Sequence, residues 1–324
     1  MKFIITSDWH LRRTVPICRL ESPTEWMEVQ RGAIRSIIET ANNIGADIVH
    51  LGDIFDKPRA DTLIVNMLIY QLYQLETTSQ FYFIAGNHDV PYRSYKSIDE
   101  VSIGTIKRIE RSYDPFLVEG EKEHIKFRYI PAGKSPIVKE AYNVGIEDYL
   151  LHSQVCPEST SWILAHHLTF QDRSPIIAEG LCVEDWIRAF PNARLFTIGD
   201  NHSGFIKQTK EALFIVPGSM TRQTIDQADY QPRSYVVEWK SPYDVEVIDE
   251  IKTDTNPKMT ESRYISTEGI KDERLNAFIQ ILKKQSDISL DFIENVRKFL
   301  SMNEIDMEVK REIRELFAEL DVKI

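Results

Sequence analysis

The sequence predicts a layered α/β fold, followed by a small helical region toward the C-terminal end. The first observation is that short, uninterrupted apolar runs alternate with longer segments whose apolar residues recur at helical spacing. The second is that the strand-like runs stop near residue 255, after which helical patterning continues to the end of the 324-residue chain. Strands that alternate with helices are typical of an α/β domain.

The first part of the chain carries three strand-like runs, at 3–5, 48–51 and 81–85. They are apolar without interruption, which suits strands that are buried on both faces. Between the first two, residues 26–44 place apolar side chains near helical spacing, and Gly45 follows as a stop signal. The segment 61–75 predicts a second helix between the next two strands.

The remainder of the predicted domain is less regular between residues 100 and 160, where a strand is expected at 125–130 and partly helical residues at 137–151. Further strands are expected at 162–165, 195–198, 214–216, 234–239 and 244–251, with a helix at 183–190. We therefore place one domain at 1–253, a polar linker at 254–270 and a helical region at 271–324. Two apolar helical faces mark that last region: Phe292, Val296, Phe299 and Leu300, then Val309, Ile313, Leu316, Phe317 and Leu320.

The composition is that of an ordinary globular protein, with 42% apolar and 27% charged residues. No apolar run approaches the roughly 18 residues of a membrane-spanning helix, so we expect no membrane segment. The first residues lack the apolar region of a signal peptide, and three scattered cysteines cannot form a disulfide framework. A reducing, cytoplasmic location is expected.

The net charge of −11 argues against non-specific binding to nucleic acid, which depends on Lys and Arg contacts to phosphates. However, metal-binding carboxylates add to the negative count, and bound cations reverse the sign locally. Composition therefore leaves nucleic acid open as a ligand.

Five short motifs of metal-ligand residues follow five of the predicted strands. They are Asp8-Trp-His10, Gly52-Asp53-Ile-Phe-Asp56, Gly86-Asn87-His88-Asp89, His166-His167 and Gly199-Asp200-Asn-His202. Because ligands at the carboxyl ends of such strands converge in one crevice, we expect these side chains to lie together. Five of the eight histidines fall in these motifs, which a scatter of core or surface histidines does not explain. The pattern is typical of a two-metal phosphoesterase.

Taken singly, most of these motifs also have an ordinary structural interpretation. Asp8 and His10 point to the same side of an extended segment, where they could share an ion or form a structural hydrogen bond. The Gly-Asp pair at 52–53 is common in turns. The 86–89 motif is more specific, because Asn87 offers a neutral oxygen ligand and His88 can face the substrate as an acid.

The ordered set of motifs resembles the calcineurin-like metallophosphoesterase superfamily. Within it, the long arm after His10, the wording of the 52–56 motif and the helical tail resemble the SbcD-type recombination and repair nuclease subunits, including bacteriophage recombination exonucleases. The motifs cover about residues 1–250, whereas the tail is similar only in architecture. The resemblance implies a layered β-sandwich flanked by helices.

The resemblance also implies partners and setting. Such a subunit acts on DNA together with an SMC-like coiled-coil ATPase of the SbcC type, which binds the C-terminal helices. A homodimer is expected on the same grounds. The compact length suggests a bacteriophage protein that acts in the host cytoplasm.

Carried over residue by residue, the resemblance implies two metal ions, Mn²⁺ or alternatively Mg²⁺. One ion would be held by Asp8, His10, Asp53 and His202. The other would be held by Asp53, Asn87, a late histidine and residue 200, with Asp53 bridging. His88 would protonate the leaving oxygen or stabilise the transition state, held by Asp89 or another carboxylate, and Asp56 would orient the ligand loop.

Two of these positions are ambiguous. Asp200 stands where the family's Gly-His-x-His pattern has a histidine; a carboxylate suits a harder ion, but Asp200 could also point elsewhere and leave the second ion weakly bound. The late histidine could be His166 or His167. We favour His167, on strand alternation and on the Leu168-Thr169 pair that follows the ligand in related sequences.

Basic residues flank the motifs and are candidates for DNA contact. They are Arg12, Arg13 and Arg19 in the first arm, and Arg93 and Lys96 after the 86–89 motif. We expect them to hold a phosphate backbone without reading sequence, although a solvated loop is an equally simple interpretation.

The leading hypothesis is a metal-dependent DNA nuclease subunit, with exonuclease or endonuclease activity, that acts in recombination, replication or repair. The first alternative is a phosphatase or phosphodiesterase for small substrates on the same scaffold. The second is a non-catalytic scaffold subunit whose site has decayed at Asp200. The chain has no Gly-x-x-x-x-Gly-Lys-Ser/Thr motif, so any ATP dependence must come from a partner.

Overall fold

The computed structural model describes residues 1–91, 95–109, 112–113, 120–122, 125–130, 162–172, 180–241 and 244–259. The chain divides into two compact units, Met1–Glu261 and Ser262–Ile324. The predicted helical region and most of the predicted linker lie outside the described residues, as does the segment expected to be partly helical at 137–151. Among the helices that are described, none combines the length and the apolar character needed to cross a membrane.

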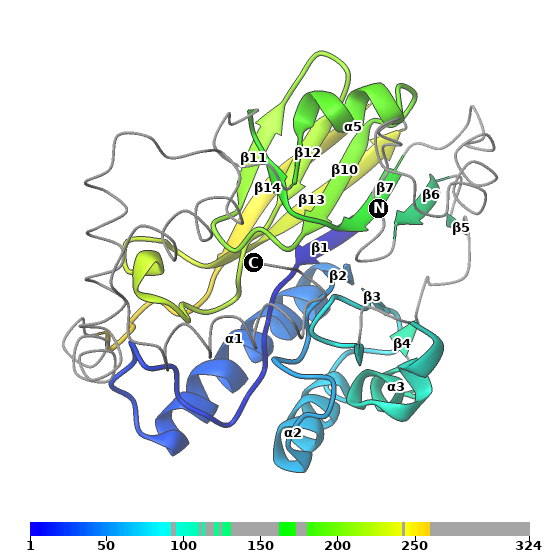
Figure 1. Cartoon of the computed structure of the whole chain (residues 1–324). Coiled ribbons are helices and arrows are strands. Elements are labelled where there is room, and N and C mark those ends of the chain that lie inside the picture. Colours follow the sequence, from blue (N-terminus) through cyan, green and yellow to red (C-terminus); the bar gives the residue numbers. More distant parts are fainter. Residues whose placement is uncertain are drawn as a thin grey trace, which may run out of the picture. The chain divides into compact units, whose positions relative to one another are not determined.

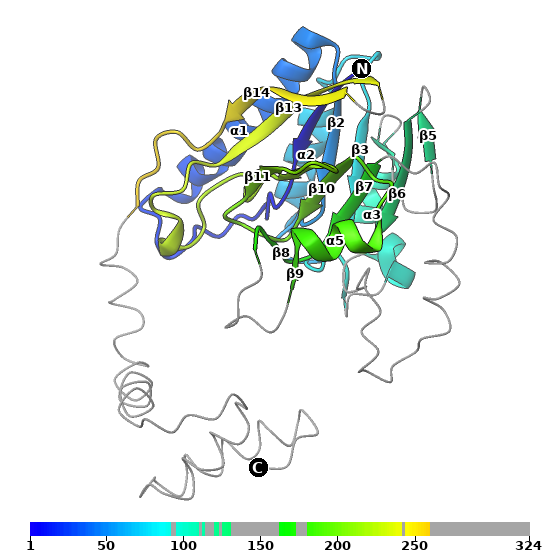
Figure 2. The same cartoon turned by 90° about the horizontal axis from the view of Figure 1, so that it is seen from above.

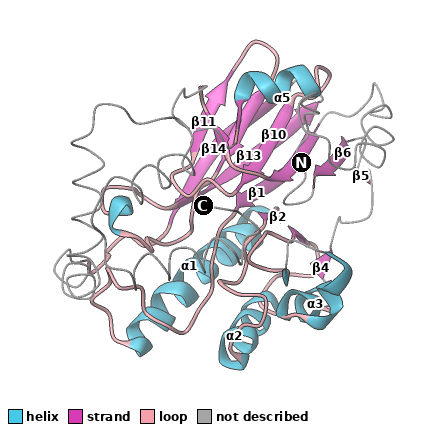
Figure 3. Ribbon diagram, viewed as in Figure 1, coloured by secondary structure: helices cyan, strands magenta, loops and turns pink. Residues whose placement is uncertain are grey.

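The first unit contains two six-stranded sheets (Figure 1, Figure 3). In spatial order, the first sheet comprises β14 (Asp244–Lys252), β13 (Arg233–Ser241), β1 (Lys2–Thr6), β2 (Asp47–Leu51), β3 (Phe81–Ile84) and β4 (Ser112–Tyr113). The second comprises β11 (Phe205–Gln208), β12 (Leu213–Val216), β10 (Leu195–Gly199), β7 (Trp162–His166), β6 (Ile125–Ile130) and β5 (Gly120–Lys122). A separate pair is formed by β8 (Thr169–Phe170) and β9 (Leu181–Cys182).

Helices cover the outer faces of both sheets, and Figure 2 shows the resulting layers. The helices in the described part of the chain are α1 (Pro23–Ile44), α2 (Thr62–Leu72), α3 (Ser102–Lys107) and α5 (Val183–Ala189), with short 3₁₀ helices η2 (Tyr95–Glu100) and η4 (Ile225–Gln227). One apolar core lies between α1, α2 and the first sheet, a second lies between the two sheets, and a third lies between α5 and the second sheet. The predicted α/β fold with helix-flanked sheets is confirmed.

Strand alternation builds these layers. In β1, Ile4 joins the core under α1, whereas its neighbours Phe3 and Ile5 join the core between the sheets. Both faces of the strand are therefore apolar, which explains the continuous runs in the sequence.

The boundaries of α1 follow from its caps. The Ser22 side chain accepts a hydrogen bond from the Glu25 amide, and the Glu25 side chain accepts one from the Ser22 amide. Pro23 is the first residue of the helix. Gly45 ends the helix in the left-handed conformation, with φ of 62°. The helix begins three residues before the start expected from its apolar spacing, because capping rather than periodicity sets its first turn.

Candidate metal centre

The predicted ligand motifs meet where parallel strands end. Strands β1, β2 and β3 run parallel, as do β7 and β10, and each leads directly into one motif. Backbone hydrogen bonds connect the first two motifs: Asp8 N donates to Gly52 O at 3.0 Å, and His10 N donates to Asp53 O at 2.9 Å. The Asp200 amide also donates to the Asp8 carboxylate, at 3.1 Å.

The backbone of this cluster is strained. Asp8, His10, Asp53 and Asp200 have φ of 51°, 44°, 57° and 83°, in the left-handed region that residues other than glycine seldom adopt. They are four of the five non-glycine residues with positive φ in the described part of the chain. Such strain costs about 1–3 kcal/mol per residue and concentrates at functional sites.

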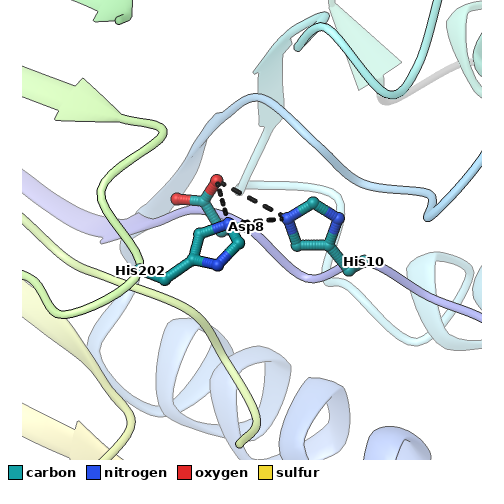
Figure 4. A group of neighbouring side chains, drawn as sticks. All are labelled: Asp8, His10 and His202. Carbon is teal, nitrogen blue, oxygen red and sulfur yellow. Dashed lines mark hydrogen bonds and ion pairs between the residues drawn. The ribbon is translucent and has the colours of Figure 1, made fainter. Parts of the chain in front are cut away.

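The first donor group, which we name position A, consists of Asp8, His10 and His202 (Figure 4). The two imidazole Nε2 atoms lie 3.0 Å apart, and Asp8 Oδ1 lies 3.9 Å from His10 Nε2 and 3.8 Å from His202 Nε2. Asp53 Oδ2 approaches the same point, 3.6 Å from His10 Nε2. Four donor atoms thus face one small volume.

The second donor group, position B, is centred on His166. Its Nε2 lies 2.9 Å from Asn87 Oδ1, 3.4 Å from Asp53 Oδ2 and 3.6 Å from Asp200 Oδ1. Asp53 Oδ2 belongs to both positions, and it is buried without a hydrogen-bond partner. An orphaned carboxylate oxygen between two groups of nitrogen and oxygen donors fits a pair of divalent cations, because buried polar atoms otherwise find partners.

The titration behaviour of the cluster reflects its burial. Burial raises the pKa of Asp8 to about 6, although neighbouring histidines oppose the shift, and it lowers the pKa of His10 to about 3 against the attraction of Asp53. Burial alone would lower the pKa of His166, but Asp53, Asp8 and Asp200 together raise it to about 10. The acidic side chains around His166 therefore favour positive charge at the place where a cation would bind.

The structure corrects the choice between the two neighbouring histidines, since it places His166 rather than His167 at position B. Trp162 and Leu164 face the core between the sheets, and β7 continues to His166, which alternation puts on the same face. His166 Nδ1 lies 2.7 Å from Leu51 O, a contact that orients the ring.

His167 lies past the end of β7 and points away from the cluster. Its Nδ1 is 3.1 Å from Leu168 O, and its ring packs edge-on against Trp186 at 6.1 Å. Two glycines make room for His166: a Cβ at Gly52 would lie 2.4 Å from His166 Nδ1, and one at Gly199 would lie 2.8 Å from it. These glycines and a count of alternation from Trp162 were the signals that could have identified His166.

His88 stands at the exposed rim of the cluster. Its amide donates to Asp53 Oδ1 at 2.8 Å, its Nδ1 lies 2.9 Å from Asp56 O, and its ring meets the His10 ring edge-on at 4.8 Å. The ring is therefore beside position A while one edge stays accessible, as an acid facing the substrate requires.

Contrary to the expectation from the resemblance, Asp89 does not contact the His88 ring. Its buried carboxylate accepts hydrogen bonds from the amides of Gly86, Ile54 and Phe55, at 2.9, 3.2 and 2.9 Å. It joins the 53–56 loop to the 86–89 loop instead of holding the His88 ring, which contacts the Asp56 carbonyl. Asp89 is therefore a positioning residue. Burial, aided by Asp53, raises its pKa to about 7.

The basic residues separate into two kinds. Arg12 donates to Asp56 Oδ1 at 3.1 Å, next to the carbonyl that holds His88, and Arg13 lies exposed 3.6 Å from Asp61. Arg19 is fully buried, so the expectation that it contacts DNA is wrong. Arg93 and the side chain of Lys96 lie outside the described residues.

Comparisons with known proteins agree with the fold and the site. The family model described as calcineurin-like phosphoesterase matches residues 1–204 of the 324-residue chain. The protein belongs to this family, and it is a metal-dependent phosphoesterase with the family's dinuclear metal-binding site. No curated protein matches the sequence.

Several solved structures are similar to this chain. A dimetal phosphatase from Danio rerio is 12% identical with a TM-score of 0.50, covering 78% of this chain and 98% of that one. An archaeal phosphodiesterase is 14% identical with a TM-score of 0.39, covering 78% and 99%. The protein TT1561 of Thermus thermophilus is 11% identical with a TM-score of 0.47, covering 78% and 98%. At these identities the likeness concerns the fold.

Proposed function

We propose that the protein is the nuclease subunit of a DNA-processing complex, which hydrolyses phosphodiester bonds with two divalent cations. The observation that carries the proposal is that Asp53 Oδ2 is shared between positions A and B. The exposed His88 donates its amide to Asp53 Oδ1, and the half-buried Arg12 pairs with Asp56, whose carbonyl contacts the His88 ring. Bound cations would supply an activated water and neutralise the charge of the phosphate. Mn²⁺ is the expected ion and Mg²⁺ the alternative.

His88 and Arg12, which belong to neither donor group, have separate roles in the proposed reaction. His88 directs Nδ1 to the Asp56 carbonyl, so in the imidazolium form Nε2 carries the proton that reaches the leaving oxygen. General-acid catalysis of this kind contributes on the order of 10²–10⁴ in rate. The Arg12 guanidinium, positioned by Asp56, offers planar donors to a phosphate without reading sequence.

The second candidate is a phosphatase or phosphodiesterase for small substrates. The burial of Arg19 favours it, because the arm then presents fewer cations to a DNA backbone, as does the net charge of −11. The similar structure from Danio rerio is a dimetal phosphatase, which agrees with this alternative.

The proposed partner is an SMC-like ATPase that binds the helical region at 271–324. Support comes from the helical spacing of the apolar residues in the sequence of that region and from the absence of a nucleotide-binding motif in this chain. We expect full-length protein to co-purify with such an ATPase. Asp substitutions at Phe317 and Leu320 should abolish co-purification and leave the metal-dependent activity intact; retained binding would contradict the proposed surface.

The experiment compares substrates under one set of conditions. Full-length protein with Mn²⁺ or Mg²⁺ is given end-labelled duplex and single-stranded DNA, and separately p-nitrophenyl phosphate. We expect DNA cleavage that Asp53→Asn abolishes and that the exposed-carboxylate control Asp229→Asn leaves unchanged. Turnover of p-nitrophenyl phosphate without DNA cleavage would select the second candidate. Two bound ions with no turnover of either substrate would select a non-catalytic scaffold.

A further inference from the structure

Positions A and B offer different donor atoms. Position A presents two imidazole nitrogens, from His10 and His202, with carboxylate oxygens of Asp8 and Asp53. Position B presents one imidazole nitrogen, from His166, with the amide oxygen of Asn87 and carboxylate oxygens of Asp53 and Asp200. Because Asp53 is common to both, the difference lies in the residues that are not shared.

Asp200 is the residue that makes position B rich in oxygen. Its backbone amide is fixed by the Asp8 carboxylate at 3.1 Å, and its φ of 83° turns the chain sharply at that point. Oδ1 of its side chain lies 3.6 Å from His166 Nε2. This carboxylate therefore lies at position B.

Donor type affects which cation binds. Carboxylate and amide oxygens suit Mg²⁺ and Mn²⁺, whereas imidazole suits zinc and its neighbours in the first transition row. Nearly every site of mixed donors binds Zn²⁺ more tightly than Mn²⁺, so selection between them depends on the ligand set and not on raw affinity. Two imidazoles at position A and one at position B are thus expected to separate the two ions.

We propose that the two positions sort divalent cations, with position A taking an ion of the Zn²⁺ type and position B a hard ion such as Mn²⁺ or Mg²⁺. Asp200 is the residue that sets the preference of position B. This inference rests on the proposed two-metal function, and at position A it replaces the expected Mn²⁺ with an ion of the Zn²⁺ type.

The test locates each metal without substrate. Metal-stripped full-length protein is crystallised with equal, limiting amounts of Zn²⁺ and Mn²⁺, and anomalous differences are measured at the two absorption edges. We expect zinc at position A and manganese at position B. In solution, we expect the electron paramagnetic resonance spectrum of this mixed pair to be that of isolated Mn²⁺. A pair of manganese ions would instead show exchange coupling between them. The same metal at both positions, or the reverse order, would overturn the proposal.

Substitutions at Asp200 test its role. Asp200→His should raise the Zn²⁺-to-Mn²⁺ affinity ratio of position B by at least about tenfold. Substitutions of residues around a metal ligand change metal affinity by a similar factor. Histidine is among the residues that tolerate positive φ, which limits added strain. Asp200→Asn keeps an oxygen donor but removes its charge. Position B of this variant should therefore bind both cations more weakly, without a shift in preference toward Zn²⁺. The control Asp229→His makes the same change at an exposed carboxylate and should leave the ratio unaltered.

The outcomes separate this inference from the proposed function. If Asp200→His does not fold, the metal distribution in the unaltered protein still decides the proposal. Two bound ions without sorting would overturn the preference alone and leave the two-metal reaction standing. No bound ion at either position would overturn both.

Discussion

Arg19 and Asp254 lie 235 residues apart in the sequence and form a fully buried, two-pronged ion pair, with Nη1–Oδ2 and Nη2–Oδ1 distances of 2.7 and 2.9 Å. The same guanidinium donates to both carboxylate oxygens of Glu21, at 3.0 and 2.7 Å. Asp254 also accepts from the Arg222 amide at 2.9 Å. This network fastens the first arm to the loop after β12 and to the segment after β14.

The network reaches the metal centre through its neighbours. Thr253 donates to Met220 O at 2.6 Å, and the Met220 amide donates to Asp8 O at 3.2 Å. Asp254 itself has a φ of 47°, as strained as the ligand residues. The buried charges therefore hold the strand end that presents Asp8 to position A.

Removing Arg19 should destabilise the protein strongly. Arg19→Met leaves the buried carboxylate of Glu21 without its cation and leaves Asp254 with only the Arg222 guanidinium, whose Nη1 lies 3.6 Å from Asp254 Oδ2. Breaking a buried pair in this way costs about 3–5 kcal/mol. Urea unfolding of the two proteins measures the difference. Arg31→Met is the matched control, because its pair with Glu28 is exposed and should change stability by less than about 0.5 kcal/mol. Equal effects of the two substitutions would contradict the assignment.

Glu21 predicts an acid-sensitive contribution to stability. Burial acts to raise its pKa, but hydrogen bonds from Arg19 and the Lys258 amide outweigh it and hold the pKa below the ordinary value of 4.5. The unfolded chain therefore takes up the proton first, so this contribution is complete above pH 4.5 and is lost as the pH falls through the folded pKa. We expect Glu21→Gln to be less stable at neutral pH and to approach the unaltered protein in acid. Parallel curves of unfolding free energy against pH would rule this out.

Asp89 should affect stability and metal binding together. Asp89→Ala leaves the amides of Gly86, Ile54 and Phe55 buried without an acceptor, at a cost of about 1–3 kcal/mol for each unsatisfied group. The 86–89 loop carries Asn87, so the affinity of position B should fall as well. Thermal unfolding and metal titration measure the two effects. A loss of turnover with stability and metal affinity unchanged would instead restore the expected catalytic role.

Bound cations should stabilise the folded chain through Asp53. A ligand at about 100 times its dissociation constant adds about 2.7 kcal/mol when it binds only the folded state. Mn²⁺ should therefore raise the melting temperature, and chelation should reverse the rise. Asp53→Asn weakens the one residue shared by both positions, so most of the shift should vanish, whereas Asp229→Asn should retain it. A shift that survives in Asp53→Asn would show that the ions bind elsewhere.

The sequence predicted the layers and the meeting of the motifs because both depend on local patterns. Continuous apolar runs mark strands with two buried faces, and parallel strands bring their ends to one edge of a sheet. The short strands β4, β5, β8, β9 and β11 were not predicted, since two to four residues carry too little pattern. The burial of Arg19 was missed because its partner Asp254 is distant in sequence, and composition alone does not distinguish a buried charge from an exposed one.

The neighbouring histidines give a direct test of the geometry, because they have the same chemistry and differ only in direction. His166→Ala removes the sole imidazole of position B, so a calorimetric titration with Mn²⁺ should lose one of two binding events. His167→Ala removes a ring that packs on Trp186 and should keep both events. Gly199→Ala should resemble His166→Ala, since its Cβ would lie 2.2 Å from Leu51 O and 2.8 Å from His166 Nδ1. If His167→Ala loses an ion and His166→Ala does not, the strand register that orients β7 toward position B is wrong.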